Sequence, residues 1–292
     1  MTVELVLDAK SILGEGPSWN AENKVLYWVD ILAGKIHRFD PARGVDDEYE
    51  IGQYVGAVVP DTEGCLVLAA RHGFYRFNPE TSELQALEDP EAELPGNRFN
   101  DGKCDVKGRF WAGTMSMSDE PGVGALYCLD TSLRVERIVA GVTCSNGITW
   151  SPDHTSMYYI DSPTKRVVQY DFDPETGKIS GGRTAVVIPE GEGLPDGMTT
   201  DNEGMLWVAQ WDGWCVSRWN PATGERLCKV EVPAARVTSC VFGGENLDEL
   251  YITTARTGIP DAELLNQPLA GGVFRHKPGV AGMPSFPFRA KK

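Results

Sequence analysis

Short apolar runs alternate with turn-forming residues along the whole chain, and this pattern predicts β-strands. An early example is Val25–Asp30, which is followed by a turn at 32–34 and then by a second apolar-rich run, Lys35–Asp40. Aromatic and β-branched residues between clusters of Gly, Pro and Asp are typical of strands joined by tight turns. Helical patterning is scarce, and the only helix we expect is a turn or two within 260–266.

The strand pattern recurs at a nearly fixed period. Matching positions in one strand of each unit are separated by 40, 44, 47, 49 and 44 residues, and they are Leu26, Leu66, Phe110, Met157, Leu206 and Leu250. A shared turn reads NPETS at 78–82, DPETG at 173–177 and NPATG at 220–224. Pro presets φ in such a turn, and the last position takes the positive φ. Periods of this length indicate propellers, solenoids or arrays.

Six units of four short strands predict an all-β fold, a six-bladed β-propeller. A β-sandwich is the alternative, but it would not require a repeat of this length. No linker-like tract divides the chain, so we expect one domain over 1–292. A strand within 3–7 is expected to pair with 272–275 and close the ring. The Pro/Gly-rich tail at about 278–292 is expected to be a short, loosely packed extension.

Polar residues occupy the same phase of several repeats. Ten or eleven residues before the reference points lie Glu15, Gly56, Asn100, Asn146, Asp196 and Ser239. In a closed radial array, these positions form one ring at one end of the central axis. Each residue alone could belong to a plain turn, and Asn-Gly at 146–147 is a strong hairpin signal. Ordinary turns have no reason to prefer one phase, so the ring predicts a site.

The chemistry of three ring residues suits a metal ion. Glu15, Asn146 and Asp196 offer two carboxylates and one amide carbonyl, which are the ligands of a hard divalent cation. His and Cys are absent from these positions, which argues against a dedicated zinc or copper site. The four histidines lie at other phases and are interpreted as structural or surface residues; they are His37, His72, His154 and His276.

Composition and charge exclude several classes of partner. The formal net charge is −15 and the isoelectric point is about 4.7, which argue against binding nucleic acid or an anionic membrane. No apolar run approaches the roughly 18 residues of a spanning helix, and the acidic N-terminus does not resemble a signal peptide. The seven cysteines form no C-x-x-C pair, so we expect reduced thiols and a cytoplasmic protein.

Motifs spread over almost the whole chain resemble one known family. They read LGEGP at 13–17, RFNDGK at 98–103, GTM at 113–115, SNG at 145–147, LPDGM at 194–198, TSCVFGG at 238–244 and PLAGGVF at 268–274. In this order they are similar to the family of senescence marker protein (regucalcin), gluconolactonase and luciferin-regenerating enzyme. The resemblance implies a six-bladed propeller that hydrolyses sugar lactones with one divalent metal ion in its central channel.

The resemblance also assigns roles to individual residues. It implies that Glu15, Asn146 and Asp196 bind the metal and that Arg98 and Asn100 contact the sugar. The family pattern places a further substrate-binding Glu in the loop at 116–122, where Glu120 is the candidate and Asp119 is its neighbour. Asp196 could also act as general base toward the attacking water.

The predicted reaction is therefore opening of an aldonolactone, such as a glucono-, xylono- or arabinonolactone, to the sugar acid. The predicted cofactor is one ion of Ca, Zn, Mn or Mg, and the predicted protein is a monomer or a weak homo-oligomer. One alternative is a calcium-binding regulatory protein without turnover. Others are an organophosphate or ester hydrolase on the same propeller, and a non-catalytic scaffold.

Overall fold

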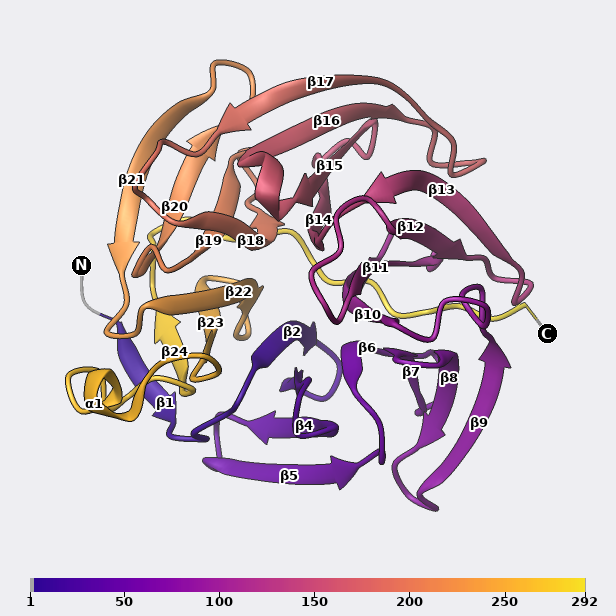
Figure 1. Cartoon of the computed structure of the whole chain (residues 1–292), viewed down its shortest axis with the longest axis horizontal. Coiled ribbons are helices and arrows are strands. Elements are labelled where there is room, and N and C mark those ends of the chain that lie inside the picture. Colours follow the sequence, from indigo (N-terminus) through magenta and orange to yellow (C-terminus); the bar gives the residue numbers. More distant parts are fainter. Residues whose placement is uncertain (1–2, 292) are drawn as a thin grey trace.

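The computed structural model describes residues 3–291, which form six four-stranded antiparallel sheets around a central axis (Figure 1). This arrangement confirms the predicted six-bladed β-propeller. The blades differ in sequence but share one arrangement. Each is a meander of four strands in which the inner strands are buried and the outermost strand is more exposed.

In each of the first three blades, the strands follow chain order from the innermost strand outward. Blade one contains β2 (Gly14–Asn20), β3 (Val25–Asp30), β4 (Lys35–Asp40) and β5 (Val45–Glu50). Blade two contains β6 (Val55–Pro60), β7 (Leu66–Ala70), β8 (Gly73–Asn78) and β9 (Glu83–Glu88). Blade three contains β10 (Asn97–Cys104), β11 (Phe110–Ser116), β12 (Gly124–Leu129) and β13 (Val135–Val142).

Blades four and five follow the same order, whereas the outermost strand of blade six comes from the start of the chain. Blade four contains β14 (Ser145–Trp150), β15 (Ser156–Asp161), β16 (Arg166–Phe172) and β17 (Ile179–Val187), with the 3-10 turn η1 (Ser162–Thr164) between β15 and β16. Blade five contains β18 (Leu194–Thr200), β19 (Leu206–Trp211), β20 (Cys215–Asn220) and β21 (Glu225–Glu231). Blade six contains β22 (Arg236–Gly243), β23 (Glu249–Ala255), β24 (Val273–His276) and β1 (Glu4–Leu7).

The two ends of the chain close the ring within blade six. β1 pairs antiparallel with β24, and Leu5 lies opposite Phe274. The pairing predicted for this region is therefore present, between 4–7 and 273–276. The expected helix is the single turn α1 (Asp261–Leu264), in the long connection between β23 and β24. Among the described residues, no helix has the length and apolarity needed to cross a membrane.

The hydrophobic core lies mainly between neighbouring blades. One buried cluster joins Val29 of β3 to Val58 and Leu68 of blade two, and another joins Trp207 of β19 to Phe242 of β22. Outermost strands such as β5 and β9 are largely exposed, with only two half-buried positions each. Burial therefore decreases outward along each blade, as the alternation of apolar and polar residues in the outer strands requires.

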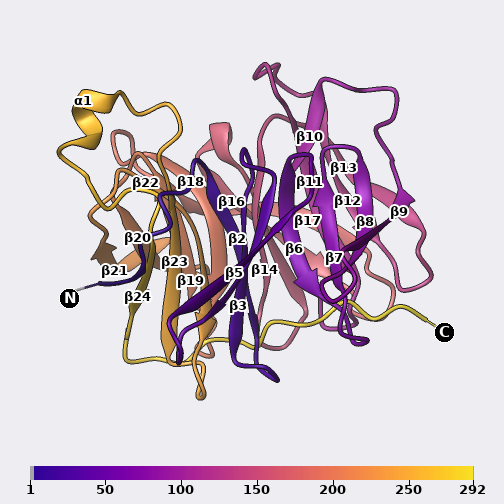
Figure 2. The same cartoon turned by 90° about the horizontal axis from the view of Figure 1, so that it is seen from below.

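The C-terminal tail is not a loose extension, and this corrects the expectation from composition. It crosses the end of the propeller opposite the site described below, as the yellow trace in Figures 1 and 2 shows. Met283 N–H donates to the Thr200 carbonyl (3.1 Å), and Phe288 N–H donates to the Pro60 carbonyl (2.9 Å). The Phe288 ring is 2% exposed and packs into the core of blades two and three. Buried apolar area and backbone hydrogen bonds outweigh the local preference of Pro and Gly for irregular structure.

Candidate functional site

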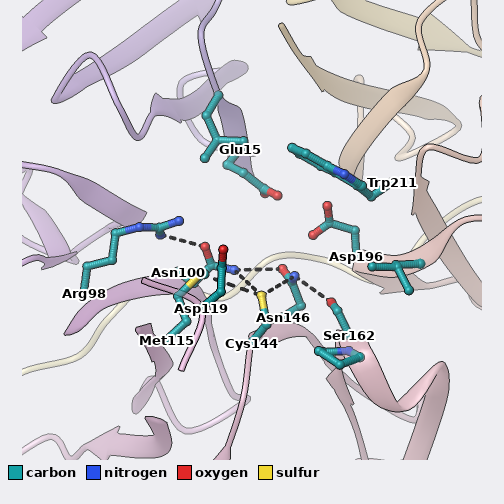
Figure 3. Close-up of a pocket in the computed structure, with 13 residues that line it drawn as sticks. Glu15, Arg98, Asn100, Met115, Asp119, Cys144, Asn146, Ser162, Asp196 and Trp211 are labelled. Carbon is teal, nitrogen blue, oxygen red and sulfur yellow. Dashed lines mark hydrogen bonds between the residues drawn. The ribbon is translucent and has the colours of Figure 1, made fainter. Parts of the chain in front are cut away.

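A cavity of about 370 Å³ opens at the end of the central axis where the innermost strands begin (Figure 3). Five of the six predicted site residues line it, and they come from four blades: Glu15, Arg98, Asn100, Asn146 and Asp196. The remaining lining residues are Leu13, Met115, Asp119, Cys144, Ser162, Pro163, Leu194 and Trp211. The repeat phase thus brought together residues that are far apart in sequence, although their roles stay predictions.

The ring residues lie on β-bulges and not in hairpin turns. Every innermost strand shifts register at or beside its ring position, for example between Ser145 and Ile148 and between Pro195 and Met198. Asn-Gly at 146–147 therefore continues strand β14, in contrast to the hairpin that this dipeptide often forms. A bulge adds one residue to one strand of a pair and redirects its side chain. Here it turns a side chain from the space between blades toward the axis.

The glycines beside the bulges allow the innermost strands to approach closely. A Cβ on Gly197 would lie 2.0 Å from Ser239 Oγ, and one on Gly56 would lie 2.5 Å from the backbone of Phe99. Any larger residue would push neighbouring blades apart at the level of the site. At Gly56 the backbone of blade three occupies the space that a side chain would need.

Two buried carboxylates lie on adjacent sides of the cavity. Glu15 is 3% and Asp196 is 4% exposed. Burial raises the pKa of Glu15 well above its ordinary value, and the charges of Asp196 and Asp101 raise it further. Burial and the charge of Asp101 raise the pKa of Asp196 in the same way. Asp196 Oδ1 is buried and has no hydrogen-bond partner within the described residues. Such an arrangement is costly without a cation.

Ser162 orients the side chain of Asn146, the third residue predicted to bind the metal. Asn146 Nδ2 donates to Ser162 Oγ (2.9 Å), and Ser162 Oγ donates to the carbonyl of Pro195 (2.6 Å). The amide orientation is fixed by this chain of bonds, so the Asn146 Oδ1 atom is the one available to the cavity. Asn100 Nδ2 donates to that oxygen at 3.3 Å. Ser162 follows Asp161 and precedes a proline, and the sequence gives no sign of this role beyond a turn.

Arg98 and Asn100 form a second polar group in blade three. Arg98 Nη1 donates to Asn100 Oδ1 (2.7 Å) and to the Phe99 carbonyl (3.0 Å). Asn100 Nδ2 also donates to the Ser145 carbonyl of blade four (2.8 Å). Burial lowers the pKa of Arg98 from its ordinary value, yet guanidinium stays protonated under ordinary conditions. The site therefore holds a fixed positive group near two buried carboxylates.

The loop at 117–123 presents a different acid from the one proposed. Asp119 lines the cavity, whereas Glu120 is exposed and is not among the described residues that line it. Asp119 has a positive φ of 57°, a backbone conformation that Asp tolerates better than most residues. The loop conformation therefore places Asp119, and not Glu120, against the cavity, and the substrate contact of Glu120 stays a prediction.

The cavity also has a side that the sequence did not reveal. Leu13, Leu194 and Trp211 are apolar lining residues beside the two carboxylates. Cys144 lies near the two asparagines, with its Sγ 3.7 Å from Met115 Sδ. Burial raises the pKa of the Cys144 thiol to about 12, so it is protonated at neutral pH and is not a ready nucleophile.

Lys103 connects two non-adjacent blades beneath the site. Its side chain starts in β10 of blade three, and its Nζ donates to the Met198 carbonyl of β18 in blade five (2.7 Å). Met198 lies two residues after Asp196, at the end of the bulge that carries it. Burial lowers the pKa of Lys103, while the charge of Asp101 opposes this shift. Lys103 therefore links these two blades inside the propeller, with the charge of Asp101 nearby.

We expect Lys103→Met to destabilise the protein by about 3 kcal/mol, because it leaves the buried Asp101 without its nearby positive charge. Adding Asp101→Asn should recover part of this loss, since the remaining buried charge disappears. A double-mutant cycle measured by chemical denaturation checks this. Strictly additive effects of the two substitutions would show that the two charges do not stabilise each other.

A separate His/Asp/Glu group lies on the outer strands of blade one. His37 Nδ1 is 2.7 Å from Asp46 Oδ2, and the ligand atoms of His37, Asp46 and Glu48 lie within 4.8 Å of one another. Lys35 Nζ is 2.5 Å from Glu48 Oε2 and already neutralises it. The His37 ring stacks on Trp28 at 3.8 Å. These contacts fit the structural role predicted for His37, and the cavity remains the better metal site.

Comparison with known proteins gives a consistent result over the whole chain. The family model described as the SMP-30/Gluconolactonase/LRE-like region matches residues 13–256. Regucalcin of Danio rerio is 41% identical over 289 residues and is covered to 98%, as is this chain. A protein of Bacillus subtilis (strain 168), provisionally named sugar lactone lactonase YvrE, is 38% identical over 288 residues, with 99% of each chain covered.

Solved structures show the same similarity. The structure of a luciferin-regenerating enzyme has a TM-score of 0.92 and 32% identity, and the match covers 99% of each chain. A calcium-binding protein, regucalcin, from Agrobacterium tumefaciens has a TM-score of 0.95 and 27% identity, with 99% of this chain and 98% of that chain covered. The similarity therefore extends from the sequence motifs to the arrangement of all six blades.

Proposed function

Because the chain belongs to the SMP-30/gluconolactonase/LRE-like family of regucalcin-like sugar lactonases, we propose that it opens the ring of a sugar lactone with the help of one divalent metal ion. The observation that carries this proposal is the cavity itself. It brings Glu15, Asn146 and Asp196 together with Arg98 and Asn100. A plain structural channel would not require two buried carboxylates, one of which has an oxygen without a hydrogen-bond partner among the described residues.

The residues present fit a divalent ion. Asp196 Oδ1 lacks a hydrogen-bond partner among the described residues, and the pKa values of Glu15 and Asp196 are raised mainly by burial. A cation would satisfy the oxygen and offset both charges. The three oxygen donors of Glu15, Asn146 and Asp196 suit Ca²⁺, Mg²⁺ or Mn²⁺ and can also hold Zn²⁺.

The bound ion would act as a Lewis acid that polarises the lactone carbonyl. Asp196 would accept a proton from the attacking water as the new carbon–oxygen bond forms. The bond between the carbonyl carbon and the ring oxygen then breaks, and the leaving alkoxide takes up that proton. The open sugar acid is the only product, and water is the only co-reactant.

Arg98, Asn100 and Asp119 would orient the substrate. Arg98 is held by Phe99 and Asn100, so its remaining N–H groups have a fixed direction. A charged guanidinium donates to sugar hydroxyls, and the exposed carboxylate of Asp119 at the mouth can accept from them. These groups would hold the bound lactone in one orientation, and a lactone free in water is not held in this way.

A panel of aldonolactones, assayed with and without a chelator, tests this function. We expect turnover of at least one glucono-, xylono- or arabinonolactone, complete loss of turnover with chelator, and recovery on adding Ca²⁺, Mn²⁺, Mg²⁺ or Zn²⁺. Binding of Ca²⁺ without turnover of any lactone would favour the calcium-binding alternative. Faster turnover of an aryl ester or phosphotriester than of every lactone would favour the ester or organophosphate hydrolase.

The same proposal includes a cytoplasmic location. All seven cysteines are free thiols in the structure, and five of them are buried. A reducing compartment maintains this state.

A further inference from the structure

The cavity has two chemically different sides. Arg98 and Asn100 lie on one side, and Trp211 lies across the cavity from Arg98, next to Asp196 (Figure 3). Leu194 is the register partner of Trp211 across β18 and β19, and Leu13 belongs to the core cluster against which Trp211 packs. We call these three residues, Leu13, Leu194 and Trp211, the apolar wall. Among their side chains, the indole N–H is the one polar group.

Contacts behind it hold the ring of Trp211 in place. The guanidinium carbon of Arg236 lies 4.6 Å from the ring centroid. Arg236 Nε donates to Asp212 Oδ1 (3.2 Å), and its Nη2 donates to the carbonyl of Gly258 (3.3 Å). A cation stacked on one face fixes an aromatic ring and leaves the cavity side free for a ligand. The apolar wall is therefore a built surface.

The connectivity of a lactone determines which part of the substrate meets this wall. The carbonyl carbon, at Glu15, Asn146 and Asp196, has two neighbours in the ring. One neighbour is C2, whose hydroxyl would point to the side of Arg98 and Asn100. The other is the ring oxygen, and the carbon beyond it carries the exocyclic substituent. With the hydroxyls on the polar side, that substituent lies toward the apolar wall.

We propose that the apolar wall is the subsite for this exocyclic substituent, and that it selects sugar lactones that end in a methyl group. The substrate class is the 6-deoxyhexonolactones, in preference to hexonolactones that differ only in a C6 hydroxyl. This inference rests on the proposed lactonase function. A methyl group gains by leaving water, whereas a hydroxyl against the wall loses hydrogen bonds to water, and the wall itself offers it only the indole N–H.

Matched pairs of substrates test the inference directly. D-fuconolactone and D-galactonolactone differ only at C6, as do L-rhamnonolactone and L-mannonolactone. An apolar pocket discriminates against one added hydroxyl by up to roughly 100-fold. We expect kcat/KM to favour the deoxy member of at least one pair by about 10-fold or more in the metal-loaded enzyme.

Variants of the wall identify the source of the preference. Trp211→Ala should reduce the preference to within about 3-fold, mostly through a higher KM for the deoxy lactone. Trp211→Phe keeps an aromatic face without the N–H and should retain most of the preference. Trp214→Ala is the matched control, because Trp214 is an exposed neighbour that lies outside the described lining of the cavity. It should change neither substrate's kcat/KM.

Two failures are distinguishable. If the enzyme turns over hexonolactones as fast as their deoxy partners, or if Trp211→Ala retains the preference, the inference about the wall is wrong and the lactonase proposal stands. If no lactone of either kind is turned over with any of the four metal ions, the proposed function is wrong and the inference falls with it. Should Trp211→Ala fail to fold, loss of the preference in Leu194→Asn replaces it, since the new amide can bond to the C6 hydroxyl.

Discussion

Asp196→Asn is expected to lower the lactone turnover rate by about 10²–10⁴-fold at saturating metal, the range typical of a positioned acid–base group. The substitution keeps an oxygen ligand of nearly the same size but removes the basic carboxylate. Metal affinity should fall moderately, because Glu15 and Asn146 remain. Turnover is measured at increasing metal concentration until it no longer changes, and the metal dissociation constant is measured by titration calorimetry.

Arg98→Ala is the matched control for this prediction. Arg98 is expected to contact the sugar and not the metal, so the variant should bind metal normally and show mainly a raised KM. If Asp196→Asn regains nearly wild-type turnover at saturating metal, Asp196 is a ligand without a role as base. Unchanged turnover in both variants would contradict the whole assignment of the cavity.

The repeat made the fold predictable from one sequence, and it placed most of the predicted site residues around one cavity, where their roles stay predictions. A propeller converts sequence period into angular position, so residues of one phase lie at one end of the axis, and Glu15, Asn146 and Asp196 line one cavity there. Local chemistry alone would have failed here, because Asn-Gly at 146–147 and Pro-Asp-Gly at 195–197 are ordinary turn signals. The structure uses them as bulges, since the strand pairing continues on both sides of each dipeptide.

Residues that act through contacts between blades were not predictable in this way. Ser162 and Lys103 reach the strand of Asp196 from blades four and three, and no period in the sequence connects those positions. Trp211 ends strand β19, where an aromatic residue is expected for packing. Only the position of its ring, next to Asp196 and stacked on Arg236, indicates a contact with substrate.

Two local predictions concerned segments whose placement depends on tertiary contacts. The tail at 278–292 has the composition of a loose extension, but it supplies Phe288 to a buried cluster and donates hydrogen bonds to several blades. The choice of Glu120 over Asp119 depended on an alignment within a loop, where backbone conformation decides which side chain faces inward. Tertiary contacts determine both outcomes, and a single sequence does not encode them in a readable pattern.

The second large expected effect is on the stability of the folded protein, which should depend on pH and on bound metal together. The pKa values of Glu15 and Asp196 are raised in the folded protein above their ordinary values of 4.5 and 3.8. The folded state therefore binds these protons more tightly than the unfolded state does. The stability that this pair contributes is present below the unfolded pKa values and is lost as the pH rises through the raised ones. Each tenfold difference in proton affinity between the two states corresponds to about 1.4 kcal/mol.

Chelated protein should therefore lose melting temperature as the pH rises from about 4.5 to 7.5, relative to a Glu15→Gln variant that lacks one of the two charges. That variant should be more stable than the wild type at pH 7.5 without metal, although it binds metal poorly. A divalent ion replaces the protons, so it should stabilise the wild type far more at pH 7.5 than at pH 5. At pH 7.5 the expected stabilisation is about 2.7 kcal/mol when the ion is present at 100 times its dissociation constant. Melting temperatures measured at both pH values, with chelator and with metal, test these expectations. Equal stabilisation by metal at the two pH values, or a Glu15→Gln variant that is less stable than the wild type without metal, would show that these carboxylates do not exchange protons for the ion.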